Sequence, residues 1–96
     1  MGLFWGDPKP HVSKREFEKY VRSELRAHHF THKEIDFVEG IFNGDMNESA
    51  ERDRGVDSTE LAQQISWLKA HKSNHSLSDE QINLIDEVMT KYIHRS

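Results

Sequence analysis

The stretch FTHKEIDFVEGIF (residues 30–42) has a counterpart 47 positions later in the chain, LSDEQINLIDEVM (residues 77–89). In both stretches a hydroxyl residue is followed three positions later by Glu or Gln: Thr31 with Glu34, and Ser78 with Gln81. This spacing is typical of a capping box, in which the hydroxyl accepts a backbone N–H and the Glu or Gln side chain reaches back. We therefore predict that each stretch begins a helix, because apolar residues then recur at helical spacing.

The residues that precede these stretches are also related, at an offset of 44. VSKREFEKYV (residues 12–21) aligns with VDSTELAQQI (residues 56–65). The same capping pattern appears in both, with two expected N-caps and their reciprocal partners: Ser13 with Glu16, and Asp57 with Glu60. Matches at caps and at apolar positions together indicate an internal duplication of a helix–loop–helix unit.

These patterns predict an all-α fold of four helices, over residues 14–28, 32–43, 58–71 and 79–94. We expect two duplicated helix–loop–helix hairpins packed in one compact domain, since neither hairpin alone can bury its apolar face. Asn43-Gly44 is expected to end the second helix, because Gly readily takes the left-handed conformation just beyond a helix. The core positions follow the helical period: Phe17, Val21, Leu25, Ile35, Val38, Ile41, Phe42, Leu61, Ile65, Leu68, Ile82, Ile85, Met89, Tyr92 and Ile93.

The predicted organisation has an irregular aromatic N-terminal arm, residues 1–12, and a single helical domain, residues 13–96. Within the domain we distinguish a first hairpin (13–44), an acidic linker (45–57) and a second hairpin (58–96). The chain carries a net charge of −4, and residues 45–60 hold the whole excess of acidic side chains. Without a basic stripe, nucleic-acid binding is not expected.

The composition limits other classes of protein. The 96 residues include no cysteine, which excludes a disulfide framework, a thiolate metal site and a cysteine nucleophile, and fits a cytoplasmic protein. No apolar run approaches the roughly 20 residues that span a bilayer, so we expect no membrane partner. The sequence also lacks a nucleophile elbow, a Gly-rich phosphate loop and an HExxH motif, and we predict that the protein is not an enzyme.

The topology over residues 13–94 resembles a paired EF-hand. The second inner loop, KAHKSNHSLSDE (residues 69–80), has no aspartate at the early ligand positions. The first inner loop, RAHHFTHKE (residues 26–34), is too short for the twelve-residue calcium loop. The resemblance therefore implies an EF-hand-like pair without calcium at these loops, and it implies that the two inner loops lie side by side.

Histidines gather in these inner loops and form a candidate metal site: His28, His32, His71 and His75. Neutral imidazoles suit Zn²⁺, and side-by-side loops would bring these rings together. In the alternative interpretation the histidines cap helix C-termini, where the helix dipole favours them. A second metal hypothesis concerns the acidic linker DMNESAERDRGV (residues 45–56), whose alternating oxygen ligands suit Ca²⁺. Its alternative is a solvated connection between helices.

Large apolar residues suggest a surface for another protein: Leu3, Phe4 and Trp5 in the arm, Phe37, Leu84 and Trp67 beside the main core positions, and Ile41 and Val88, which extend the stripe of Phe37 and Leu84. Alternatively, the arm folds back and the helical residues simply belong to a broad core. Our leading hypothesis is a small non-enzymatic interaction module that uses an apolar groove or the aromatic arm. We expect no cofactor other than the candidate Zn²⁺, and a monomer or weak homodimer.

Overall fold

The computed structural model describes residues 11–46 and 55–95. These residues are helical apart from their turns and one isolated backbone bridge, so the all-α prediction is confirmed for them. The helical elements, in chain order, are α1 (Lys14–Glu16), η1 (Phe17–Val21), α2 (Arg22–Ala27), α3 (His32–Met46), α4 (Ser58–Ala70), the short η3 (Lys72–Asn74) and α5 (Asp79–Arg95). The first three run on without a break and form one helix, called the first helix below.

All four predicted capping boxes are present, and each one starts a helix. The side chains of Ser13, Thr31, Asp57 and Ser78 accept a backbone N–H from the residue three positions later, at 2.9–3.1 Å. That residue's Glu or Gln side chain accepts the N–H of the cap residue at 2.8–3.0 Å. The predicted helix starts are therefore confirmed by the hydrogen bonds that motivated them.

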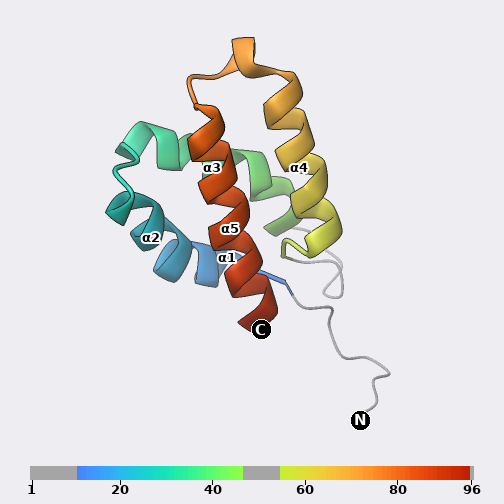
Figure 1. The fold of residues 1–96 in the computed structure, drawn as a ribbon. Coiled ribbons are helices and arrows are strands. Elements are labelled where there is room, and N and C mark those ends of the chain that lie inside the picture. The colour runs from blue at the N-terminus through green and yellow to red at the C-terminus, as the bar shows by residue number, and fades with distance from the viewer. Residues whose placement is uncertain (1–10, 47–54, 96) are drawn as a thin grey trace.

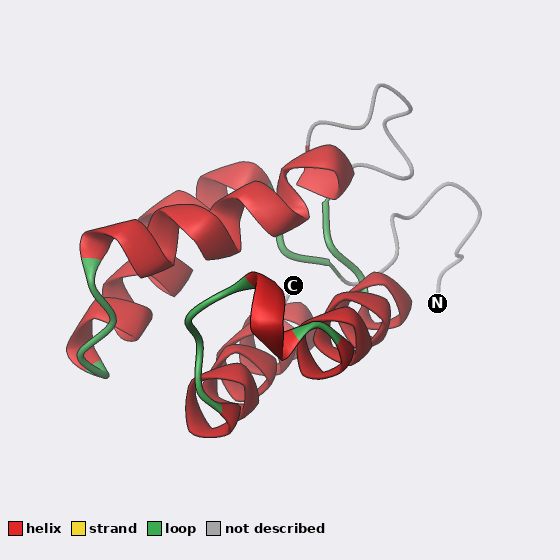
Figure 2. Ribbon diagram, turned by 90° about the horizontal axis from the view of Figure 1, so that it is seen from above, coloured by secondary structure: helices red, strands yellow, loops and turns green. Residues whose placement is uncertain are grey.

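The helices pack in two directions. Helices α4 and α5 lie side by side and run antiparallel, joined by the loop 71–78 at the top of Figure 1. Helix α3 lies across this pair, as the view nearly along α4 and α5 makes clear (Figure 2). The first helix lies beside the C-terminal half of α5, where Lys91 contacts Glu24. No helix within the described residues is both long and apolar enough to cross a lipid bilayer.

One hydrophobic cluster joins all four helices. Every predicted core position is buried in it except Ile41, which is half-buried against it. The cluster also takes in Val88 of α5 and five apolar residues that lie beside the helix starts or beyond the expected helices: Val12, Phe30, Met46, Val56 and Leu77. Phe30 and Leu77 precede their capping boxes directly, which fits the hydrophobic staple that fixes how a chain enters a helix.

The expected end of α3 at Asn43-Gly44 is wrong. The helix continues to Met46, whose side chain is only 2 % exposed. Gly44 has no neighbour within 4 Å of the position a Cβ would take, and its φ is not positive. A glycine inside a helix costs about 1 kcal/mol, whereas burying a methionine side chain contributes about 1.5–3 kcal/mol. Tertiary burial thus outweighs the local stop signal.

A pair of backbone hydrogen bonds ties the start of the first helix to the start of α4. Val12 and Val56 exchange N–H···O bonds of 2.9 and 2.8 Å. Gly55, just before this bridge, has a φ of +102°, and a Cβ there would lie 2.2 Å from Cδ2 of His11. Only glycine combines that backbone conformation with that close approach. The bridge joins the two residues that the sequence repeat places at equivalent positions.

The first helix also contains a feature that the sequence pattern did not predict. Residues Phe17–Val21 form a π-helical turn, closed by the N–H of Arg22 donating to the carbonyl of Phe17. A π-turn holds one extra residue, so it rotates the side chains near it relative to a plain α-helix. Tyr20, which the apolar period leaves off the core stripe, comes to lie against Tyr92 of α5.

Candidate functional site

The histidine-rich turn after α2 is a helix end followed at once by a helix start. The N–H of Phe30 donates to the carbonyl of Leu25 at 3.1 Å, and the N–H of His29 donates to that of Arg26 at 3.0 Å. These two bonds form a Schellman motif, with His28 as the C-cap and His29 in the left-handed conformation at φ +71°. His28 and His29 therefore form the turn that ends α2.

Both ring nitrogens of His75, in the second inner loop, form hydrogen bonds with the backbone. Nδ1 accepts the N–H of Leu77 at 3.1 Å, and Nε2 lies 2.8 Å from the carbonyl oxygen of Leu68. Because a carbonyl only accepts, Nε2 must carry the proton, and a single neutral tautomer satisfies both contacts. His71 similarly donates from Nδ1 to the carbonyl of Trp67 at 2.9 Å. Both histidines therefore satisfy carbonyl groups near the end of α4, as in the capping interpretation.

The predicted zinc ligands do not form a metal centre in the described part of the chain. No group of three or more His, Cys, Asp or Glu side chains among residues 11–46 and 55–95 is arranged to hold an ion. His32 instead lies 3.6 Å from a carboxylate oxygen of Asp36, with most of its side chain exposed. The calcium hypothesis falls largely on residues 47–54, which lie outside the described residues.

Four rings from two helices and the loop form a continuous aromatic row: Phe37, His75, Trp67 and His71. The ring centroids of Phe37 and His75 are 5.8 Å apart, those of His75 and Trp67 are 6.4 Å apart, and those of Trp67 and His71 are 4.8 Å apart. Trp67 stacks on His71 yet keeps 39 % of its surface exposed. The row is therefore a solvent-facing aromatic surface that spans α3, α4 and the loop between α4 and α5.

A pocket of about 330 Å³ opens beside this row, between the start of α3 and residues 74–77. Phe37, Leu77 and His75 supply its apolar and aromatic lining, and Lys33 and Glu34 supply charged groups. The pKa of Glu34 is lowered by the backbone N–H of Thr31 and then by the side-chain amide of Gln81. The pocket therefore combines an aromatic wall with one fixed carboxylate.

The other residues predicted to contact a partner have different positions. Ile41 and Leu84 are half-buried and pack against the core, so little of each is available to a partner. Val88 is only 4 % exposed and belongs to the core, which agrees with the broad-core alternative for that residue and not with a contact role. Leu3, Phe4 and Trp5 lie outside the described residues.

Sequence reasoning missed a second aromatic feature, a stack of Tyr20 on Tyr92. The ring centroids lie 5.5 Å apart at an interplanar angle of 11°, and Tyr20 is 42 % exposed. Three cations surround the stack: Lys19, Lys91 and Arg95. One signal was present in the sequence, since the dipeptide Lys-Tyr occurs at 19–20 and again at 91–92. Their meeting, however, depends on the π-turn and on tertiary packing.

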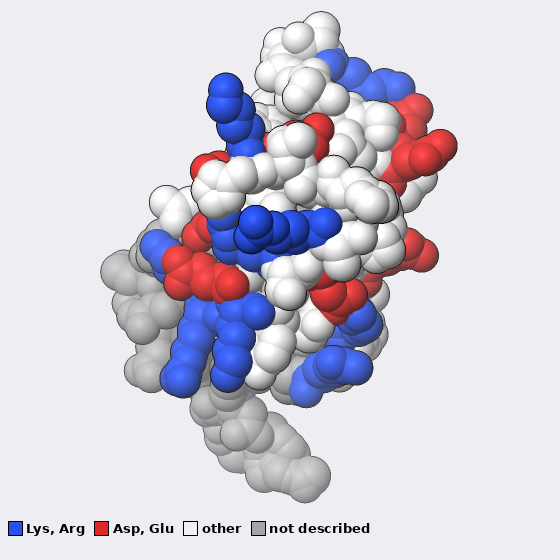
Figure 3. All heavy atoms as spheres, turned by 90° about the vertical axis from the view of Figure 1, so that its left-hand side faces the viewer, with Lys and Arg blue, Asp and Glu red and all other residues white. Residues whose placement is uncertain are grey.

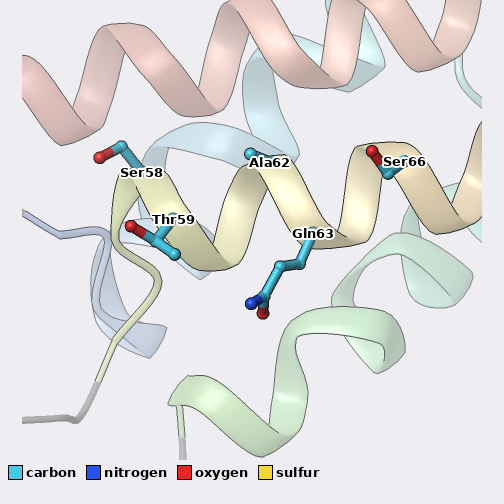
Figure 4. A pocket seen from close by; sticks show the side chains of 5 residues that line it. All are labelled: Ser58, Thr59, Ala62, Gln63 and Ser66. Carbon is cyan, nitrogen blue, oxygen red and sulfur yellow. The ribbon is translucent and has the colours of Figure 1, made fainter.

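A further hollow runs along the outer face of α4, lined by small or uncharged side chains: Ser58, Thr59, Ala62, Gln63 and Ser66 (Figure 4). All five come from one helix and none is charged or aromatic, so this face offers a partner little to recognise.

No protein-family model, curated protein sequence or solved structure matches the chain.

Proposed function

We propose that this protein is a non-enzymatic module that binds another protein through the aromatic row and the pocket beside it. In this proposal the pocket receives an apolar or aromatic side chain of the partner, and Trp67 packs against the partner's backbone and neighbouring side chains. The observation that carries the proposal is the exposed Trp67, whose ring lies 6.4 Å from that of His75, which with Phe37 lines the pocket.

Physical chemistry supports a binding role for this surface. A tryptophan leaves substantial apolar area in water when exposed, and burying it against a partner is favourable. Tryptophan is also enriched among the few residues that supply most of the binding free energy at protein interfaces. Trp67 is held in place by its stack on His71, so little conformational freedom is lost when a partner arrives.

We also propose that the two helix pairs arose by internal duplication. The four capping boxes support this, as does the bridge between Val12 and Val56, which occupy equivalent positions in the repeat. The likeness to a paired EF-hand stays a prediction, and backbone pairing here joins the segments before the first helix and α4 instead of the inner loops. A cytoplasmic location is likewise a prediction, based on the absence of cysteine.

The proposal can be tested with a peptide library displayed on phage and selected on the folded protein. We expect enriched peptides to share a large apolar residue and to shift the NMR signals of Phe37, Trp67 and His75. Replacing a hot-spot tryptophan by alanine typically costs 2 kcal/mol or more, so Trp67→Ala should weaken binding by about 30-fold.

Gln63→Ala is the matched control, because Gln63 lies exposed on the same helix and lines the α4 hollow instead of the pocket. Its affinity for the selected peptides should equal that of the unchanged protein. Selected peptides that bind Trp67→Ala as tightly as the parent, or a selection that enriches nothing, would contradict the proposed site.

A further inference from the structure

The Tyr20–Tyr92 stack carries an unusual concentration of positive charge. Nζ of Lys19 lies 5.4 Å from the centroid of the Tyr20 ring. Nζ of Lys91 and Cζ of Arg95 lie 5.2 and 5.4 Å from the centroid of the Tyr92 ring. Tyr92 belongs to the buried core, so the exposed Tyr20 ring and the three cations around the stack form the surface, called the tyrosine patch below. Figure 3 shows one face of the molecule, on which Lys and Arg side chains are interspersed with Asp and Glu side chains.

This charge is only partly neutralised within the described residues. Glu24 accepts a hydrogen bond from Lys91 at 2.6 Å and also attracts Arg95 electrostatically, while Lys19 and Arg95 form no direct ion pair within the described residues. Lys91 and Arg95 are four residues apart on one helix, where like charges repel each other. The cations lie close to the rings because the quadrupole of an aromatic face attracts them. The patch therefore keeps an electrostatic surplus that an anion would relieve.

The backbone beneath the patch is itself irregular. Lys19 and Tyr20 lie within the π-turn Phe17–Val21, which turns Tyr20 toward α5 while leaving 42 % of it exposed. A π-turn is less favourable than an α-helical turn, and such turns occur often at functional sites. An exposed tyrosine held by a local irregularity, beside unpaired cations, has the features of a recognition surface.

We propose that the tyrosine patch binds an acidic segment of a partner protein, with carboxylates at Lys19 and Arg95 and an apolar side chain on the face of Tyr20. The acidic partner follows from charge complementarity. A peptide suits the patch better than a nucleic acid, because the chain as a whole carries −4 and would repel an extended polyanion beyond the patch.

This surface is separate from the pocket of the proposed function. The pocket lies at the N-terminal end of α5 and the patch at its C-terminal end. From Asp79 to Tyr92 the helix axis advances about 20 Å at 1.5 Å per residue. The two surfaces can therefore be occupied and tested independently.

The test uses two synthetic eight-residue peptides, EELEELEE and its uncharged counterpart QQLQQLQQ, titrated into the full chain and followed by NMR. The glutamate peptide should bind at least about tenfold more tightly, with weaker binding as salt rises from 20 to 150 mM. The double variant Lys19→Gln with Arg95→Gln should bind the glutamate peptide about tenfold more weakly, as expected for the loss of two exposed charge contacts. Signals of Tyr20 and Tyr92 should move during the titration.

Arg26→Gln with Lys69→Gln is the matched control, since it removes the same charge from exposed positions elsewhere. The control and Trp67→Ala should both bind the glutamate peptide normally, which separates this proposal from the pocket. Equal affinity for the two peptides on the unchanged protein would overturn the proposal without any variant. Equal losses of peptide affinity in both double variants would also overturn it. Tighter binding of an eight-nucleotide oligo(dT) or of phosphatidylserine vesicles than of the glutamate peptide would overturn it as well. Self-association that is lost in the Lys19/Arg95 variant would assign the patch to a second copy and also overturn it.

Discussion

His29 holds a backbone conformation that is unfavourable for any residue with a β-carbon. Its φ of +71° places it at the position after the C-cap of α2, where glycine is most frequent. The sequence HHFTH (residues 28–32) suggests a metal site because three histidines fall within five residues. In the structure the geometry at His29 is set by the Schellman bonds of the turn.

We predict that His29→Gly stabilises the protein. Glycine adopts the left-handed conformation without the steric cost of a β-carbon, but it also loses more backbone entropy on folding. The net gain should be about 0.5–1 kcal/mol in the free energy of unfolding. Urea denaturation at pH 7.5 measures it. Ala27→Gly, two residues earlier at the end of α2, should destabilise the protein by about 1 kcal/mol as the control. An unchanged or lower stability for His29→Gly would mean that the imidazole makes a favourable contact of its own.

At the scale of the elements, His75 connects α4 to α5 through the main chain. We predict that His75→Ala lowers the free energy of unfolding by about 1–3 kcal/mol, because the Leu77 N–H and the Leu68 carbonyl both lose their partner. Hydrogen exchange at the Leu77 amide should accelerate at the same time. His32→Ala removes a largely exposed ring and should change stability by less than about 0.5 kcal/mol. If the two variants were equally stable, the loop would be held by Leu77 burial alone.

The helix starts could be predicted from the sequence because their causes are local. A capping box needs only two side chains three residues apart, and all four boxes formed as expected. The end of α3 could not be predicted in the same way. Asn43-Gly44 is a local stop signal, but the helix continues because Met46 is buried by distant residues. The π-turn at Phe17–Val21 could not be predicted either, because the apolar residues of this segment follow the ordinary 3.6-residue period.

The residues of the candidate site could likewise be predicted only where their signal is local. Phe37 and Trp67 stood out in the sequence as apolar residues beside the core stripes, and both belong to the aromatic row. Val88 stood out for the same reason but is buried, since periodicity does not reveal how wide a helix face the core covers. Tyr20 could not be anticipated, because its contact with Tyr92 joins residues 72 positions apart through the π-turn.

At the scale of the whole molecule, Glu24 links the first helix to the last. Its carboxylate accepts hydrogen bonds from Lys91 Nζ at 2.6 Å and from the hydroxyl of Tyr92. These bonds, the Lys91 bond foremost, lower the pKa of Glu24 below its ordinary value of 4.5. Glu24 therefore contributes stability that is fully present above about pH 4.5 and is lost as the pH falls through the lowered pKa.

We predict that Glu24→Gln lowers the free energy of unfolding at pH 7 by about 1 kcal/mol, since a neutral amide replaces a charged acceptor that is partly solvated. Between pH 4.5 and pH 2.5 the variant should lose stability less steeply than the parent, because one carboxylate with a lowered pKa has been removed. Urea denaturation across this pH range measures both effects, with Glu80→Gln as an exposed control. Parallel pH profiles for parent and Glu24→Gln would contradict the role of this carboxylate. Apolar packing would then be the main attachment of the first helix to α5.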